Sequence, residues 1–204
     1  YCTDGYIYRV HDGSSQKLMA ADDIKLPGTH NLENYMAAFA ATDGYVDDDT
    51  CISVAKSFSG VEHRLEQVRV LNGVTFINDS IGTSPTRTAA GLHALKQKPI
   101  LIAGGYDKHI PFDELGDEIC RHVKKLYLTG ATTEKIYDAV TKSKYFDGSL
   151  PIEKIDNFKD TVLAAANSAR DGDIVLLSPA CAAFDKFKNF MERGKYFKQI
   201  VMEL

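Results

Sequence analysis

Polar and charged residues follow four apolar runs of this 204-residue chain, at the positions where those runs end. Asp79 offers a carboxylate, and Lys108 offers an ammonium group that could bind a phosphate or a carboxylate. Taken singly, such residues are more often turn residues, helix caps or solvated lysines. Their convergence at one sheet edge would instead favour a binding site, because ligands of open α/β sheets lie beyond the carboxyl ends of strands. The four strand-end segments are Asn78-Asp79-Ser80, Gly104 to Lys108, Thr129-Gly130 and Ser178-Pro179.

Two further groups of residues could contact a nucleotide. Asn31 and Asn34 are three residues apart in a predicted helix, so their amides could read one base edge. The alternative is that one is a cap and the other an exposed polar residue. Arg64 could bind a phosphate through its planar guanidinium, or pair with a surface carboxylate.

The stretch from Asp173 to Gly194 is a candidate wall of the site. Residues 174–177 form an apolar run that predicts a buried strand, which ends at Ser178-Pro179 because proline is excluded from strand interiors. Four small residues follow, and then Phe184, Phe187, Phe190 and Met191 recur at a spacing that predicts a helix. A helix that starts near the small residues would present free backbone amides to a ligand. Many α/β turns share this pattern without binding anything.

The segments that must position these residues predict an α/β fold. From about residue 61 onwards strands alternate with helices, which predicts a Rossmann-like domain with a mostly parallel sheet covered on both faces. Asn72-Gly73 predicts a tight hairpin between the first two strands. The predicted strands are 67–70, 74–78, 99–103, 125–128, 152–155 and 174–177, and the predicted helices are 85–96, 112–123, 132–141, 158–169 and 195–203.

Residues 1–60 have a different organisation. Residues 5–20 predict a β-hairpin, and residues 26–31 predict a loop in which Thr29 or Asn31 caps the next helix. A second helix is predicted from Asp48 or Asp49 to Lys56. The pattern breaks at residues 57–60, where we place a domain boundary.

The composition excludes several classes of function. A net charge of −4 provides no footprint for nucleic acid or an anionic membrane. The longest apolar runs are about six residues, far short of the roughly 20 that span a bilayer. The four cysteines are scattered without metal-site spacing, which predicts reduced thiols. The chain also lacks the GxxxxGK[ST], GxGxxG, GxSxG and HExxH motifs.

Five segments, taken in order, resemble the Mur ligases: LPGTHNLENYMAA, EHRLEQV, NGVTFINDSIGTSP, ILIAGGYDK and VLLSPACAAFDKFKNFMERGKYF. The resemblance covers nearly the whole chain, and the last segment is typical of the branch that adds D-glutamate. It implies that residues 1–60 are the hairpin and helical tail of a central ATP-binding domain. Residues 61–204 would then be the C-terminal amino-acid-binding domain.

The resemblance also implies an activity: ATP-dependent addition of D-glutamate to UDP-N-acetylmuramoyl-L-alanine through an acyl phosphate, with Mg²⁺. The expected protein is a cytoplasmic, monomeric ligase of peptidoglycan synthesis, and so of cell shape and division, without nucleic-acid or membrane partners. By similarity, the residues that contact ATP are Asn31, Asn34, Arg64 and Asp79. Those that hold D-glutamate are Thr83, Lys108, Phe190 and the backbone at Ala182 and Ala183. No catalytic residue and no metal ligand is implied.

The chain departs from the family pattern at two positions. Ile81 stands where many relatives have lysine, and Ala183 stands where some have serine. Either the substrate contacts come from elsewhere or the amino acid is held differently. The family's P-loop, its modified lysine and its UDP-binding domain would all lie upstream of Tyr1. We therefore expect a fragment that folds but has no ligase activity alone. The alternatives are another Mur ligase, a folylpolyglutamate synthase relative, or a non-catalytic α/β interaction module that uses the aromatic helix after Ser178.

Overall fold

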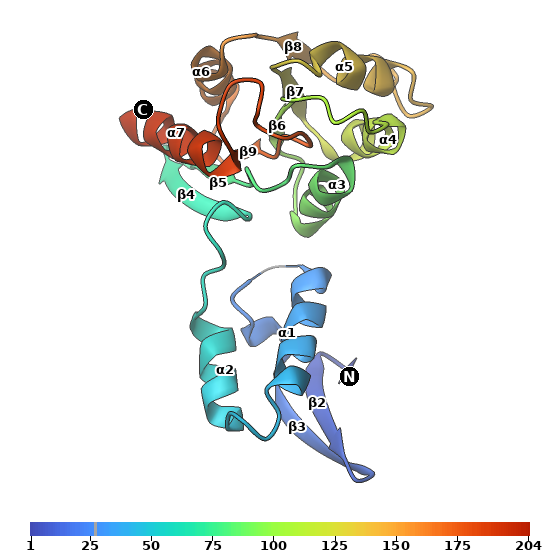
Figure 1. Ribbon diagram of the computed structural model, residues 1–204, viewed down its shortest axis with the longest axis vertical. Helices are drawn as coiled ribbons and strands as arrows, with labels where there is room; N and C mark the ends of the chain where they lie inside the picture. Colours follow the sequence, from blue (N-terminus) through green and yellow to red (C-terminus); the bar gives the residue numbers. More distant parts are fainter. Residues whose placement is uncertain (27) are drawn as a thin grey trace. The chain divides into compact units, whose positions relative to one another are not determined.

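The chain divides into two compact units, Tyr1–Gly60 and Val61–Leu204, in a computed structural model that describes residues 1–26 and 28–204 (Figure 1). The smaller unit contains a three-stranded antiparallel sheet of β1 (Cys2–Thr3), β2 (Tyr6–His11) and β3 (Ser14–Ala20). It continues with the short 3₁₀ helix η1 (Ala21–Asp23) and the helices α1 (Thr29–Ala41) and α2 (Asp48–Ser57). Its core is formed by Ile7, Met19, Phe39 and Ala55. The predicted hairpin and both predicted helices are confirmed.

The start of α1 differs from the prediction. Gly28 occupies the N-cap position with a φ of 105°, and as a glycine it makes no side-chain capping hydrogen bond. Thr29 and Asn31 lie inside the first turn, so neither is the cap, and only part of the predicted 26–31 loop is a loop. Pro27 of that segment lies outside the described residues. Gly28 can take this position because a glycine adopts positive φ without strain.

The larger unit is built on a six-stranded sheet with the order β4-β5-β9-β6-β7-β8. Its strands are β4 (Glu66–Leu71), β5 (Val74–Asn78), β6 (Ile100–Ala103), β7 (Lys125–Leu128), β8 (Ile152–Lys154) and β9 (Ile174–Leu177). β4 pairs antiparallel with β5 across the Asn72-Gly73 turn, and the other pairs are all parallel. The predicted strands and the mostly parallel sheet are confirmed.

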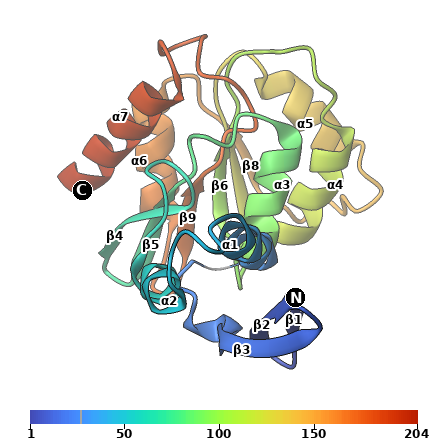
Figure 2. The ribbon, with the colours of Figure 1, turned by 60° about the horizontal axis from the view of Figure 1, so that its bottom comes forward.

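Helices cover both faces of this sheet (Figures 1 and 2). One face carries α3 (Pro85–Ala94), α4 (Asp113–His122) and α5 (Thr133–Thr141), and the other carries α6 (Phe158–Ser168) and α7 (Phe190–Glu203). Successive residues of a strand point to opposite faces. In β6, Leu101 therefore packs in the core under α3 to α5, while Ile100 and Ile102 pack in the core under α6 and α7.

The helix predicted to start near Ala182 does not form. Twelve residues, 178–189, separate β9 from α7, and α7 begins at Phe190 because the Asn189 side chain caps it, accepting from the Glu192 backbone N–H at 2.9 Å. Phe187 packs edge-on against Phe158, whereas Phe184 is exposed and contacts Tyr106. The aromatic spacing thus serves separate tertiary contacts of a loop rather than one helix face.

All four cysteines are free, as predicted. Among the helices formed by the described residues, none is both long enough and apolar enough to cross a bilayer.

Candidate functional site

The segments that follow β5, β9 and β6 are joined by backbone hydrogen bonds at one edge of the sheet. The Asp79 N–H donates to the Leu177 carbonyl at 2.7 Å, and the Gly104 N–H donates to the Pro179 carbonyl at 2.8 Å. The Tyr106 N–H donates to the Ala182 carbonyl at 2.9 Å, forming an isolated antiparallel bridge. The predicted convergence of the strand ends is therefore confirmed.

Gly104 and Gly105 allow these segments to approach closely. Their φ angles are +114° and +149°. A Cβ atom on Gly104 would lie 1.9 Å from the Thr129 carbonyl oxygen, and one on Gly105 would lie 2.5 Å from the Ala182 carbonyl oxygen. Since no side chain fits at either position, the glycine pair has a packing role at the junction of three strand ends.

Asp79 is buried at this junction, with only 5% of its surface exposed. One carboxylate oxygen accepts from the Ser178 hydroxyl at 2.7 Å, and the other accepts from the Leu65 backbone N–H at 3.2 Å. Burial raises the pKa of Asp79 to about 6, although both hydrogen bonds and the charges of Arg64 and Arg87 oppose the shift. The carboxylate is thus held inside the edge of the sheet and points at these two partners rather than into an open crevice.

Lys108 and Thr83 form the more exposed part of the junction. The Lys108 ammonium donates to the Thr83 carbonyl at 2.9 Å. Pro85 is the first residue of α3, as predicted, and the Ser84 side chain makes no capping hydrogen bond to the helix. An ammonium beside the positive end of a helix favours an anionic group.

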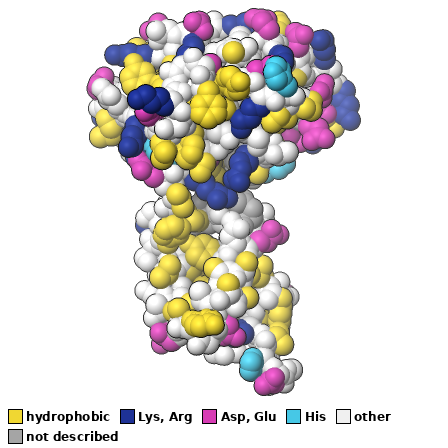
Figure 3. Space-filling view, viewed as in Figure 1, with side chains coloured by type: hydrophobic (Ala, Val, Ile, Leu, Met, Phe, Trp, Pro, Cys, Tyr) yellow, Lys and Arg dark blue, Asp and Glu magenta, His cyan; other side chains and the backbone are white. Residues whose placement is uncertain are grey.

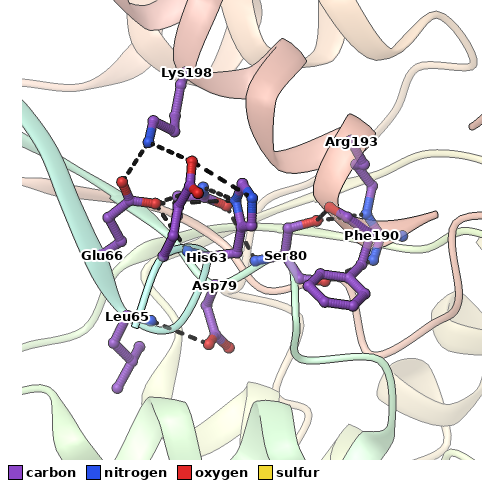
Figure 4. A network of polar contacts seen from close by, with 10 residues as sticks. His63, Leu65, Glu66, Asp79, Ser80, Phe190, Arg193 and Lys198 are labelled. Carbon is purple, nitrogen blue, oxygen red and sulfur yellow. Dashed lines mark hydrogen bonds and ion pairs between the residues drawn. The ribbon is translucent and has the colours of Figure 1, made fainter. Parts of the chain in front are cut away.

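Arg193 is a residue of this site that sequence reasoning missed. It is 2% exposed, and its guanidinium donates to the Ser80 hydroxyl at 3.0 Å and to the Ser80 carbonyl at 2.9 Å. It also donates to the carbonyls of Cys181 at 3.0 Å and Ala182 at 3.1 Å. Burial lowers the pKa of Arg193 to about 10, so it stays charged at neutral pH. Figure 4 shows Arg193 beside Ser80. Arg193 therefore fixes the loops after β5 and β9 against each other.

A signal for Arg193 was present in the sequence. It lies four residues before Phe197 and seven before Ile200, both of which are buried. This spacing places all three on one face of α7. A charged residue on the buried face of a helix indicates that it has polar partners in the interior.

A second polar network adjoins Arg193 through Ser80 (Figure 4). The buried His63 accepts through Nδ1 from the Asn78 amide at 2.9 Å, and Asn78 in turn accepts from the Ser80 N–H at 3.1 Å. Glu66 accepts from the His63 N–H at 2.9 Å and from the Lys198 ammonium at 2.5 Å. Burial lowers the pKa of His63. The network connects the first residues of the larger unit to α7.

The remaining predicted residues lie partly in the larger unit and partly in the smaller one. Phe190 lies edge-on to His63 with ring centroids 6.0 Å apart, and its carbonyl accepts from the Ser80 hydroxyl at 2.8 Å. Arg64 is exposed. In the smaller unit, Asn31 and Asn34 lie on α1, three residues apart, with Asn34 exposed.

Ala182 and Ala183 are buried in the loop between β9 and α7, not at a helix start. The Ala183 carbonyl accepts from the N–H groups of Lys186 and Phe187, which closes a tight turn. The prediction that this position supplies free helix amides is therefore wrong.

Lysine and arginine side chains gather on part of the larger unit's face in Figure 3. Their positive charge favours the approach of an anion to that face.

Comparison with known proteins assigns the family. The family described as "Mur ligase, glutamate ligase domain" matches residues 63–181. The chain belongs to the Mur ligase family. Among curated Mur ligases, it is 51% identical over 194 residues to the UDP-N-acetylmuramoylalanine--D-glutamate ligase of Acetivibrio thermocellus, covering 93% of this chain and 42% of that protein. It is 47% identical over 205 residues to the ligase of the same name from Clostridium botulinum, covering 100% of this chain and 44% of that protein.

The chain thus spans less than half the length of these curated Mur ligases. Solved structures share its fold at low sequence identity. A pseudomurein peptide ligase type C from Methanothermus fervidus aligns with a TM-score of 0.63 and 16% identity, covering 99% of this chain and 40% of that one. E. coli FolC in complex with ADP aligns with a TM-score of 0.63 and 16% identity, covering 98% and 47%.

Proposed function

We propose that this chain is the amino-acid-binding part of a ligase that adds D-glutamate to UDP-N-acetylmuramoyl-L-alanine at the expense of ATP. The observation that carries the proposal is the 51% identity, over 93% of the chain, to a curated ligase named for D-glutamate addition. The chain covers only 42% of that relative. The activity would therefore belong to the complete ligase, and the isolated chain is expected to bind but not to ligate.

The geometry supports a D-glutamate site at the strand-end junction. D-Glutamate carries two carboxylates, and Lys108 provides an exposed ammonium next to Thr83 and the start of α3. Charge-assisted hydrogen bonds are the stronger ones in proteins, so this ammonium suits a substrate carboxylate. Arg193 would act indirectly by holding the backbone of Ser80, Cys181 and Ala182 in place. Phe190 would form a side wall of the site.

The residues of this chain fit only part of an ATP site. Arg64 is exposed and carries a charge suited to phosphate, and Asn34 offers an exposed amide. Both oxygens of Asp79 already accept hydrogen bonds, and none of the metal-ligand groups among the described residues includes Asp79. ATP would supply the phosphoryl group that activates the substrate carboxylate. Mg²⁺ would need oxygen ligands beyond those that this junction offers.

The proposed reaction implies a cellular role. A ligase with these substrates serves peptidoglycan synthesis, and hence cell-wall growth, cell shape and division, in the cytoplasm. We propose that it acts as a monomer.

A chimera tests the proposal. The chain replaces the matching C-terminal segment of the Acetivibrio thermocellus ligase, and phosphate release is measured with UDP-N-acetylmuramoyl-L-alanine and either D- or L-glutamate. We expect release with D-glutamate and little with L-glutamate. In the chimera, Lys108→Ala should raise the KM for D-glutamate by about 10–100-fold, since a hydrogen bond to a charged group contributes about 1.5–3 kcal/mol.

Lys142→Ala is the matched control. Lys142 is an exposed lysine at the C-cap of α5 that pairs with Asp138, so its removal should leave the KM unchanged. Equal KM values for the two folded variants would remove Lys108 from the site. Preference for L-glutamate or L-alanine would instead favour another Mur ligase or a folylpolyglutamate synthase, and a folded chimera without activity would favour a non-catalytic module.

A further inference from the structure

Three side chains of types that can ligate a metal meet where α3 and α4 pack against each other. His93 lies in the last turn of α3, and Glu118 and His122 lie four residues apart on α4. Residues four apart share one face of a helix. The three side chains come from two helices that are already held together by the hydrophobic core.

The ligand atoms of these residues lie within 4.8 Å of one another. His93 Nε2 is 2.5 Å from Glu118 Oε2, and His122 Nε2 is 3.4 Å from the same oxygen. The two imidazole rings are 4.9 Å apart between centroids. Ligands about 2.0–2.1 Å from a tetrahedral zinc ion are about 3.3 Å from each other. The present spacing therefore needs only small side-chain rotations to match such a site.

We propose that His93, Glu118 and His122 form a binding site for a divalent transition metal ion, with Zn²⁺ as the best fit. Two imidazoles and one carboxylate are a donor set that zinc accepts, leaving a fourth position for water. The histidine side chains are 55% and 40% exposed, so an ion can enter from solvent. A groove of about 570 Å³ between α3 and α4 opens beside His93 and Glu118.

Arg121 competes with a metal ion for Glu118. Arg121 donates to Glu118 Oε1, whereas both histidines face Oε2. The contact leaves Oε2 available to the ion, but it also places a positive charge nearby. Lys98 is a second cation close to His122. Both positive charges should weaken metal binding. Removal of Arg121 should therefore strengthen it.

The other three-ligand group of the described residues, Glu62, His63 and Glu66, does not support the same proposal. The Lys198 ammonium already contacts both glutamates, at 3.1 Å and 2.5 Å. A cation position there is therefore already filled by the protein. The cluster of His93, Glu118 and His122 also lies away from the strand-end junction, because the eight helical steps from Pro85 to His93 span about 12 Å.

Metal titration of the chain, first treated with a chelator, tests the proposal. Co²⁺ is the probe because its visible d–d bands report coordination, and ZnCl₂ is then added to displace it. We expect one equivalent of Co²⁺ to bind and Zn²⁺ to displace it. His93→Ala and His122→Ala should each weaken binding at least about tenfold, since loss of even an outer-shell partner costs about 10–100-fold. Arg121→Ala should bind about twofold to fivefold more tightly, because it frees Glu118 and removes a nearby positive charge.

His109→Ala is the matched control, since this exposed histidine lies outside the cluster and should bind metal like the unaltered chain. Cys120→Ser controls for the α4 thiol, which donates to the Val140 carbonyl. The proposal is overturned if either cluster histidine variant binds Co²⁺ as tightly as the unaltered chain. It is also overturned if a thiolate-to-cobalt charge-transfer band appears and vanishes in Cys120→Ser.

Discussion

Arg193 organises the candidate site without being exposed to a ligand. It satisfies the carbonyls of Ser80, Cys181 and Ala182, which lie in two loops about 100 residues apart. A buried carbonyl that loses its donor costs about 1–3 kcal/mol. Replacement of one side chain would therefore leave several unsatisfied groups at once.

We predict that Arg193→Ala lowers the free energy of unfolding of the larger unit by about 3 kcal/mol or more. Arg193→Lys should recover little of this loss, because an ammonium cannot reproduce the planar fork. Urea unfolding measures both. Arg69→Ala is the control: Arg69 donates to the Val201 and Met202 carbonyls near the surface, and its loss should cost about 1 kcal/mol. Similar losses for the two alanine variants would contradict the assigned role.

Asp79 makes stability depend on pH. Its pKa is raised from 3.8 to about 6 in the folded chain. Between these two pH values the folded state therefore holds a proton that the unfolded state has released. The stabilisation by this proton is complete below pH 4 and is lost as pH rises through about 6. Above that pH the ionised carboxylate destabilises the fold by about 2–3 kcal/mol.

Asp79→Asn tests this prediction. Asparagine is neutral at every pH and can still accept one hydrogen bond, so the variant should match the unaltered chain at pH 4. At pH 7.5 it should be more stable by up to about 2–3 kcal/mol. Urea unfolding at several pH values measures the difference between the two curves, which isolates Asp79 from other titrating groups. A constant difference across this pH range would refute the raised pKa.

At the scale of single elements, α7 depends on its cap. Asn189 accepts from the Glu192 N–H at 2.9 Å and sets the first residue of the helix after a twelve-residue loop. This start determines the register of α7, and so places Arg193 opposite Ser80.

We predict that Asn189→Ala lowers the free energy of unfolding by about 1 kcal/mol. Asn157→Ala, which removes the equivalent cap of α6, should have a similar effect. Ser84→Ala should change stability by less than either, because Ser84 occupies the N-cap position of α3 without a capping hydrogen bond. Chemical denaturation compares the three. An equal loss of unfolding free energy in Ser84→Ala would show that the missing capping hydrogen bonds do not cause the destabilisation.

At the scale of the whole molecule, the two units have cores of very different size. The smaller unit has a single small core around Ile7, Met19, Phe39 and Ala55, whereas two large clusters cover the faces of the sheet in the larger one. A 60-residue unit buries only about 60% of its unfolded surface and is marginally stable. The larger unit has two large core clusters of its own. It should therefore fold independently of the smaller unit.

We predict that residues 61–204, expressed alone, unfold cooperatively with nearly the midpoint that this unit has in the full chain. Phe39→Ala should destabilise only the smaller unit, and Leu176→Ala only the larger one, each by about 3 kcal/mol. Calorimetry of the full chain and residue-resolved hydrogen exchange distinguish these outcomes. Loss of the larger unit's structure in Phe39→Ala would contradict independent folding.

The sequence by itself determined the order of the elements and the edge of the sheet at which the candidate site lies. Apolar periodicity and turn residues are local signals, and parallel strands bring their carboxyl ends to one side. This reasoning placed Asp79 and Lys108 at one junction, and it predicted the Asn72-Gly73 hairpin. The binding roles of all the candidate site residues stay predictions, as does the assignment of the two units to ATP and amino-acid binding.

Only the tertiary structure decided which partners these residues have. Ser80 and Arg193 are 113 residues apart, and no local pattern reports their hydrogen bond. The loop at Ala182 takes its conformation from a bridge to Tyr106, so its small residues do not start a helix. His93 and Glu118 come within 2.5 Å because α3 and α4 pack side by side. Local sequence encodes backbone preference and burial, whereas partners across the fold depend on how the elements pack.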